Sequence, residues 1–370
     1  MRIVVVGAGI LGASTAYHLA REGCEVVLVD RADEGRATAA GAGIVCPWGS
    51  PVEDPAYYAL LAHGARYYPR LVEMLAEDGE HDLGYARVGG LYVTSDPADL
   101  ETVERRARER AANAPEAGQI QRLSPADARE LFPPLRPDQP ALYVSGGARL
   151  DGRRVAAALQ RAAVTHGARF VNGSAELVVQ GNRVRGVRVD SALIESDRVV
   201  VAAGAWAPAI LKPVGIALPV EPQRGQIVHL RLPGTDTSRW PVLLPLNSYY
   251  LLAFEDSRVV VGASREANSG FDYRLTAAGV AGVLNAGLAV APGLASWTLH
   301  EIRIGFRPFA PDNLPMLGNV PGTDGLFIGN GLGPSGLAMG PFSGAQIARL
   351  AIGKPSEIPL GPYAPMRHML

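Results

Sequence analysis

The chain opens with apolar strand patterns on either side of a glycine turn and a helical segment. Residues 2–6 are an apolar run, residues 7–12 are rich in glycine, residues 14–21 are helical in character, and residues 25–30 form a second apolar run. Strand, glycine turn, helix and strand in this order are typical of the unit that binds a dinucleotide pyrophosphate. The pattern therefore predicts a nucleotide site at the amino-terminal end.

Each special residue of this unit meets a need of dinucleotide binding. Gly7 allows the tight turn after the strand, and Gly9 lets backbone N–H groups approach a pyrophosphate. Gly12 lets the helix pack closely on the strand, and the helix start adds its positive dipole end. Asp30, which ends the second strand, is placed to accept hydrogen bonds from a ribose hydroxyl. The unit alone leaves open which dinucleotide binds.

Helical and strand patterns continue along the rest of the chain. Helices are predicted over residues 57–79, 99–114, 125–131 and 153–167. Residues 36–50, rich in glycine and alanine, are predicted to form a loop. Residues 220–263 change to an alternating pattern, which predicts a second, largely antiparallel sheet. Residues 326–352 return to strand, glycine loop and helix.

These changes of pattern predict an α/β protein (α+β overall) with two domains. A Rossmann-like, nucleotide-binding domain is predicted from three chain segments, residues 1–85, 143–217 and 302–370. A mainly antiparallel β-sheet domain with helices is predicted from residues 86–142 and 218–301, and we expect it to supply the substrate pocket.

Composition narrows the classes of function. The chain has 35 basic and 36 acidic residues, so its charge favours neither nucleic acid nor an anionic membrane as a partner. Lys212 and Lys354, the only lysines, each precede a proline, which leaves little scope for a catalytic lysine. Cys24 and Cys46 offer no metal cluster and no disulfide framework, which fits a reducing, cytoplasmic compartment.

Membrane and export signals are also missing from the pattern. No apolar stretch approaches the roughly 18 residues of a spanning helix, so we expect no transmembrane segment. Because the first predicted strand starts at residue 2, we expect no signal peptide before it.

A later predicted strand, which ends in glycine, indicates FAD as the dinucleotide. Residues 197–204 have the pattern Asp-x-Val-Val-x-Ala-Ala-Gly, which typically accompanies the amino-terminal unit in two-part FAD sites. Further matching segments are residues 6–12, 89–91, 202–206, 224–226, 305–308, 311–315 and 329–336. Over essentially its whole length the chain thus resembles the D-amino acid oxidase-like flavoproteins, the group that holds glycine oxidase, D-amino acid dehydrogenase and sarcosine oxidase.

The resemblance implies a set of FAD-binding residues. They are Gly7, Gly9, Ile10, Leu11, Gly12, Asp30, Arg31, Thr38, Ala39, Ala40, Gly43, Ile44, Glu176, Ala203, Gly204, Trp206, Arg307, Gly331, Leu332, Gly333, Pro334, Ser335, Gly336 and Leu337. Core packing is the alternative interpretation for the ring of Trp206. Many relatives carry histidine at the position of Leu332, so a mechanism that depends on that histidine is in doubt. No cysteine follows Cys46, so FAD is expected to bind without a covalent link.

The same resemblance implies three substrate-site residues. Arg307 corresponds to the arginine that anchors the amino acid carboxylate, and a guanidinium suits this role as a permanently charged fork. Without that context, an arginine after a strand is more commonly part of a structural ion pair. Tyr250 falls where glycine oxidase has an active-site tyrosine, with Tyr249 on the opposite face of a strand. Cys46 either faces the flavin ring or is a plain buried cysteine.

The activity implied is FAD-dependent oxidation of a small amine or D-amino acid, of the glycine, D-amino acid or N-alkyl amino acid type. We expect hydride transfer from the substrate α-carbon to flavin N5, followed by hydrolysis of the imine, so that the enzyme acts on CH–NH2 or CH–NH bonds. Alternatives are a dehydrogenase that passes electrons to a quinone or partner protein, a flavin-carrying subunit of a larger complex, and a nicotinamide-dependent dehydrogenase. A homo-oligomer stays open, and no residue stands out as a catalytic base.

Overall fold

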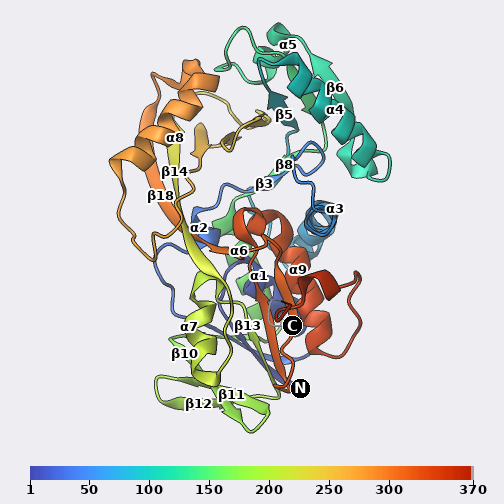
Figure 1. The fold of residues 1–370 in the computed structure, drawn as a ribbon, viewed down its shortest axis with the longest axis vertical. Helices are drawn as coiled ribbons and strands as arrows, with labels where there is room; N and C mark the ends of the chain where they lie inside the picture. The colour runs from blue at the N-terminus through green and yellow to red at the C-terminus, as the bar shows by residue number, and fades with distance from the viewer. Residues whose placement is uncertain (368–370) are drawn as a thin grey trace.

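The computed structural model describes residues 1–367 of the chain. Figure 1 shows two parts, one above the other, joined by the long strands β14 (Glu221–Arg231) and β18 (Thr298–Phe309). The lower part holds the amino-terminal strand and α9 (Gly336–Ala351), and the upper part holds α4 (Pro97–Ala111), α5 (Pro125–Leu131) and α8 (Ala277–Val290).

The lower part is built on a six-stranded sheet. Its order is β19 (Met316–Asn319), β20 (Leu326–Asn330), β13 (Arg198–Val201), β1 (Arg2–Val6), β2 (Glu25–Asp30) and β9 (Arg169–Asn172). All neighbours are parallel except β19 and β20. Successive side chains of β1 pack in different hydrophobic clusters, Val4 on one face of the sheet and Val5 on the other. Burial of both faces explains the continuous apolar runs of these strands.

Different layers cover the two faces of this sheet. On one face lie α1 (Ile10–Arg21), α6 (Gly152–Thr165) and α9, with α3 (Pro55–Glu77) packed on α9. The other face carries α7 (Ala207–Leu211) and a meander of β10 (Ala175–Gln180), β11 (Arg183–Val189) and β12 (Ala192–Glu195). The carboxyl ends of β1, β2 and β13 border a cavity, as is typical of ligand sites in open α/β sheets.

The upper part is built on an eight-stranded sheet. Its order is β18, β14, β17 (Arg258–Gly262), β16 (Tyr250–Phe254), β15 (Val242–Pro245), β5 (Gly90–Val93), β7 (Ala141–Val144) and β6 (Ile120–Leu123). Only the β15–β5 pair is parallel among these described strands. Helix α8 packs on β14 and β17. The predicted combination of a parallel α/β sheet with a mainly antiparallel sheet is thus confirmed.

Short elements connect the two parts. The helix α2 (Ala37–Ala40) and the strand β3 (Ile44–Val45) lie in the segment predicted as loop, and β3 pairs with β8 (Ala148–Arg149), which also pairs with β4 (Ala86–Arg87). The division into domains stays a prediction, and β18 crosses its boundary at residue 302. Among the described residues, no helix is both long and apolar enough to cross a membrane.

Candidate active site

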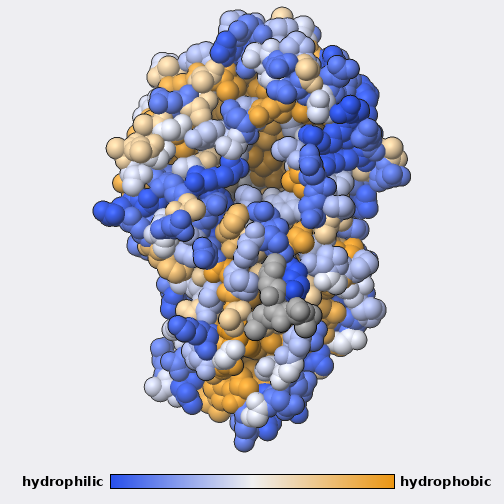
Figure 2. Space-filling model, in the orientation of Figure 1, coloured by the Kyte–Doolittle hydropathy of each residue, from blue (hydrophilic) through white to orange (hydrophobic). Residues whose placement is uncertain are grey.

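A cavity of about 850 Å³ lies between the two sheets. Its wall contains the glycine turn after β1, the end of β2, the loop with α2, the start of α9, and parts of β16 and β18. The face shown in Figure 2 is hollowed in its upper half, and apolar residues are visible inside the hollow. A volume near the upper end of the range for small-molecule sites is suited to a large cofactor together with a substrate.

The glycine turn after β1 tolerates no side chain at two positions. Gly7 has a φ of +104°, and a Cβ there would lie 2.5 Å from the carbonyl oxygen of Ala202. A Cβ on Gly12 would lie 1.8 Å from the carbonyl oxygen of Gly7. The tight turn and the close helix packing predicted from the sequence are therefore both present.

Asp30 holds this turn as well as facing the cavity. Its Oδ2 accepts the N–H of Ala8 over 2.7 Å, and its Oδ1 accepts the N–H of Ala32 over 2.7 Å. Arg36 lies 3.5 Å from Oδ1. Because each carboxylate oxygen has a second lone pair, Asp30 retains the capacity to accept a ribose hydroxyl.

Two long helices begin at this cavity. The N-cap residues of these helices, Gly9 of α1 and Ser335 of α9, make no side-chain hydrogen bond to the first turn. One N–H of α1, that of Ile10, donates to Thr38 Oγ1 over 3.0 Å. Free N–H groups and the positive dipole ends of both helices thus face one volume, which favours a ligand with anionic and acceptor groups at two places.

Asn330 joins the two other glycine turns of the site. Its Nδ2 donates to the carbonyl oxygen of Gly204 over 2.9 Å, and its Oδ1 accepts the N–H of Gly331 over 2.7 Å. Asn330 is 2% exposed, and its hydrogen bond to Gly331 is fully buried. Gly204 and Gly333 have φ values of +55° and +50° and open space where a Cβ would stand. The backbone at both turns is therefore accessible to a ligand.

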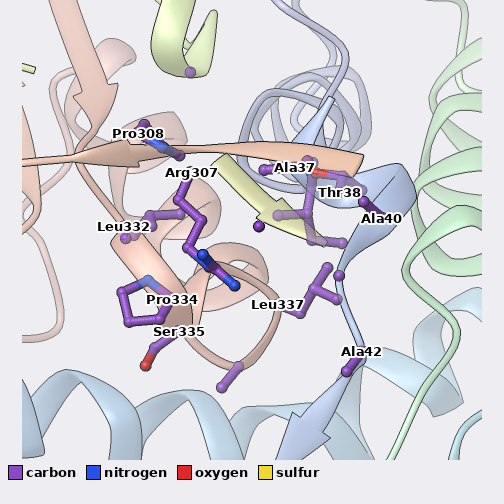
Figure 3. A pocket seen from close by; sticks show the side chains of 18 of the residues that line it. Ala37, Thr38, Ala40, Ala42, Arg307, Pro308, Leu332, Pro334, Ser335 and Leu337 are labelled. Carbon is purple, nitrogen blue, oxygen red and sulfur yellow. Dashed lines mark hydrogen bonds between the residues drawn. The ribbon is translucent and has the colours of Figure 1, made fainter. Parts of the chain in front are cut away.

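Arg307 reaches from β18 into the cavity, toward Pro334 and Ser335 (Figure 3). Its Nη1 donates to the carbonyl oxygen of Ser264 over 3.0 Å and to Gln223 Oε1 over 3.4 Å. No carboxylate of the described residues lies within ion-pair distance of it. Burial lowers the pKa of Arg307, and the nearby Tyr250 acts against that shift. A guanidinium placed in this way lacks an anion, which a bound carboxylate would supply.

Tyr250 is the tyrosine that lies beside Arg307. A Cβ on Gly262 would lie 2.5 Å from the Tyr250 hydroxyl, so the ring fills the space that the glycine leaves. Burial raises the pKa of Tyr250 and the charge of Arg307 acts against it. Tyr249 packs on the opposite side of the strand, toward α8. Both tyrosines belong to the cavity wall, and Tyr250 is the one beside Arg307.

Cys46 lines the cavity and is also buried. Its sulfur lies 3.4 Å from the hydroxyl oxygen of Tyr92. Burial raises the pKa of the thiol to about 12. The group therefore stays a neutral thiol and packs as a small apolar side chain.

Most of the predicted cofactor residues lie together in the wall of the cavity, and three do not. Gly12 packs behind the turn, and the carbonyl oxygen of Ala39 accepts a hydrogen bond from Arg153 over 2.8 Å. Glu176 has a 74% exposed side chain that lies 3.8 Å from Arg188, while its neighbour Ala175 lines the cavity. Strand alternation explains why Ala175 and not Glu176 lines the cavity, since adjacent residues of β10 point in opposite directions.

Trp206 combines both interpretations considered for it. Its ring stacks on Phe271 with centroids 5.0 Å apart and meets Phe306 edge to face at 6.2 Å. The residue also belongs to the cavity wall. Leu332, where many relatives have histidine, is buried in the same wall, and no histidine of residues 1–367 lines it.

Sequence reasoning missed three residues of the site. Asn330 is one, Arg265 is a second, and Tyr57 was predicted only as part of a helix. The hydroxyl of Tyr57 donates to Ser335 Oγ over 2.7 Å, which ties α3 to the start of α9. The three residues share no local motif, and only their long-range contacts reveal them.

The comparisons with known proteins agree with this geometry. The family model "FAD dependent oxidoreductase" (DAO) matches residues 2–350. The chain belongs to this family. Similar to this chain is the glycine oxidase of Pseudomonas aeruginosa, 31% identical over 98% of each chain. An uncharacterized oxidoreductase of Bacillus subtilis, YurR, is 47% identical over 98% of each chain.

A solved structure shares the whole fold. The crystal structure of iminodiacetate oxidase from Chelativorans sp. BNC1 has a TM-score of 0.96 and 52% sequence identity, and the match covers 98% of this chain and 99% of that one. The predicted family resemblance and the fold class are confirmed.

As a member of this family the protein is an FAD-dependent oxidoreductase. Its described residues fit the cofactor at two places. The glycine turn, Asp30 and the start of α1 fit the ribose and pyrophosphate. The Gly331–Ser335 loop and the start of α9 offer N–H groups to the acceptor edge of a flavin.

Proposed function

We propose that the protein oxidises a small amine or amino acid bearing a carboxylate, with FAD as the bound cofactor and dioxygen as the electron acceptor. The observation that carries this proposal is the Arg307 guanidinium, which points into the cavity without a carboxylate partner among the described residues. A substrate carboxylate would complete its hydrogen bonds and balance its charge.

The residues around Arg307 support a positioning role for this end of the cavity. Bound FAD would supply the acceptor for a hydride from the substrate α-carbon, and hydrolysis of the resulting imine needs only water. The guanidinium orients the carboxylate, and the protonated Tyr250 hydroxyl beside it can donate a further hydrogen bond. Orientation of this kind removes a large part of the entropic barrier.

The start of α9 would stabilise negative charge on a flavin held at this end of the cavity. This sixteen-residue helix begins without a side-chain cap, so its first N–H groups and its positive dipole end can stabilise an anion. The neutral Tyr57–Ser335 pair next to it adds polarity without adding charge. No acidic or histidine side chain of the described residues is required for C–H cleavage by hydride transfer.

Two relatives bear on the substrate. One is named for oxidation of glycine and another for oxidation of iminodiacetate. These names are consistent with a substrate amine that carries either one or two carboxylates. Both names also denote oxidases, which supports dioxygen over a quinone as the acceptor. Non-covalent FAD, a cytoplasmic location and the two-domain division remain proposals of the same account, supported by the two free cysteines and the two main sheets.

An anaerobic bleaching screen tests the proposal. The holoenzyme is mixed with glycine, sarcosine, D-alanine, D-proline and iminodiacetate, and the flavin absorbance is followed. We expect at least one of these to reduce the flavin and dissolved oxygen to restore it within the turnover time. Absence of reduction by every amine, or reduction without reoxidation by oxygen, would contradict the oxidase assignment. Acid denaturation should release the flavin into an ultrafiltrate.

A further inference from the structure

Arg265 is a second cation at the same end of the cavity. It follows β17, lines the cavity and has an exposed side chain. Its Nη1 donates to the carbonyl oxygen of Ser248 over 2.7 Å. No carboxylate of the described residues lies within ion-pair distance. A guanidinium has five N–H donors, so most of those of Arg265 are free to bind a ligand.

Arg265 and Arg307 are connected through one peptide unit. The carbonyl oxygen of Ser264, which accepts the hydrogen bond from Arg307, belongs to the peptide that leads into Arg265. The positive charge of Arg265 acts to lower the pKa of Arg307 and of Tyr250, and also that of Tyr57. All four side chains belong to residues that line the same cavity.

The backbone around Arg265 is held in place on both sides. Glu266 exchanges backbone hydrogen bonds with Arg224 over 2.9 and 3.1 Å, and its carboxylate is bound by the Arg224 guanidinium at 2.6 Å. Ser264 is fixed through its hydroxyl, which donates to Glu266 over 2.6 Å. Because residues 264 and 266 are engaged on the β14 side, the side chain between them extends the other way, toward the cavity.

Charge at this end is unbalanced. Glu266, the acid next to the two arginines, is already bound by Arg224, Gln226 and Ser264. A substrate with one carboxylate at Arg307 would leave Arg265 unpaired, with two like charges near one another. A second substrate carboxylate would relieve that repulsion and fill the free donors of Arg265.

We propose that Arg265 binds a second carboxylate of the substrate, so that the preferred substrate is a secondary amine flanked by two carboxymethyl-type groups. This inference rests on the proposed function. Iminodiacetate is the simplest compound of this class, and larger N-carboxymethyl amino acids belong to it as well. Arg307 holds the carboxylate next to the carbon that is oxidised, and Arg265 holds the carboxylate on the other side of the nitrogen.

The reaction balances for iminodiacetate. One C–H bond next to nitrogen breaks, its electron pair goes to FAD, and a C=N bond forms. Water adds to this bond, and the C–N bond then breaks to give glyoxylate and glycine. Dioxygen takes the two electrons with two protons and becomes hydrogen peroxide.

Binding of unreactive analogues tests the inference without turnover. Oxydiacetate replaces the amine by an ether oxygen and keeps both carboxylates, whereas methoxyacetate keeps only one. Each is titrated into the holoenzyme while the flavin spectrum is recorded. We expect oxydiacetate to bind at least about tenfold more tightly, as two charged hydrogen-bonding sites allow. We expect Arg265→Gln to bring the ratio close to one, and Arg265→Lys to retain part of it.

A matched control separates this site from general charge. Arg106 on α4 also lines the cavity, forms no ion pair among the described residues, and is not among the charges acting on Arg307 or Tyr250. Arg106→Gln makes the same charge change and should keep the preference for oxydiacetate. Equal binding of the two analogues to the wild type, or an unchanged preference in Arg265→Gln, would overturn the inference.

The two proposals can fail separately. If amines with one carboxylate reduce the flavin but Arg265→Gln keeps the preference for oxydiacetate, only the role of Arg265 is wrong. If the preference depends on Arg265 but no amine reduces the flavin, the two-carboxylate site stands and the oxidase assignment fails. In steady state, the loss in Arg265→Gln should fall mainly on the KM for iminodiacetate.

Discussion

Nη1 of Arg307 donates a hydrogen bond to the carbonyl oxygen of Ser264 over 3.0 Å, and this contact ties β18 to the segment after β17. The guanidinium lies directly over Gly225 of β14, where a Cβ would be 2.5 Å from Nη2. The position of the fork is thus set by a carbonyl on one side and by a missing side chain on the other. The strand pairing that aligns Gly225 with Gly305 makes this arrangement possible.

Gly225→Ala should impair substrate binding without unfolding the protein. The new methyl group would push the guanidinium away, and the end of a flexible side chain can move where backbone cannot. Displacement of a positioning group by about 1 Å can cost about 100-fold in rate, so kcat/KM for the preferred amine should fall by about 10- to 100-fold. FAD content and melting temperature should change little.

Gly361→Ala is the matched control for this substitution, since a Cβ there would meet no atom within 4 Å. It should leave kcat/KM within about a factor of two. Wild-type kinetics in Gly225→Ala would show that Arg307 does not need its observed position.

Asn330→Ala should weaken FAD binding. The substitution removes both hydrogen bonds that join the Gly204 and Gly331 turns and leaves a partly buried carbonyl oxygen and a buried N–H without their partner. Each such loss costs about 1–3 kcal/mol, so we expect an increase of about tenfold or more in the Kd for FAD, together with a lower melting temperature of the apoprotein. Fluorescence titration of apoprotein with FAD measures this. An unchanged Kd would mean that the turns hold their shape without Asn330.

Stability should fall in mildly acidic solution because of His18. Its Nδ1 lies 2.7 Å from the carbonyl oxygen of Ser14 and its Nε2 lies 2.5 Å from the Tyr67 hydroxyl. Burial lowers the pKa of His18 to about 4. His18 therefore takes up a proton near pH 6.5 in the unfolded chain, but only near pH 4 in the folded protein. The free energy of unfolding falls as the pH falls from about 6.5 to about 4.

This loss is on the order of 3 kcal/mol at pH 4. His18→Gln should flatten that part of the curve of unfolding free energy against pH, as measured by urea denaturation at pH 4 to 7. An equally steep curve in the variant would assign the effect to other groups, among them the buried His229, whose pKa burial lowers to about 3.

The sequence predicts local structure well where one period dominates. The β1, α1 and β2 unit is found as predicted because its apolar runs and glycines satisfy local and tertiary needs together. The short helix Pro125–Leu131 has the predicted bounds, since Ser124 caps it and proline starts it. Helix α8 was not predicted because its residues are almost all small or apolar and show no polar face.

The site was predictable in its motifs and not in its long-range contacts. Arg307 was found through its Gly-Phe-Arg-Pro context, although it lies within β18 and not after a strand. Asn330 contacts Gly204 across 126 residues of chain, and no local pattern encodes that pairing. Arg265 follows a strand and belongs to no motif. The charge of Arg265 is seen to be unbalanced only because the neighbouring Glu266 is already bound by Arg224 and Gln226.

The rate of anaerobic flavin reduction in Arg307→Ala tests the central claim most directly. The amine that reduces the wild type fastest is used, and both proteins are compared at equal FAD content. Loss of two charged hydrogen bonds to a carboxylate corresponds to about 3 kcal/mol, so the second-order rate constant for reduction should fall by about 100-fold or more. A variant that keeps its FAD and is reduced within about threefold of the wild-type rate would contradict the assignment of Arg307 as the carboxylate anchor.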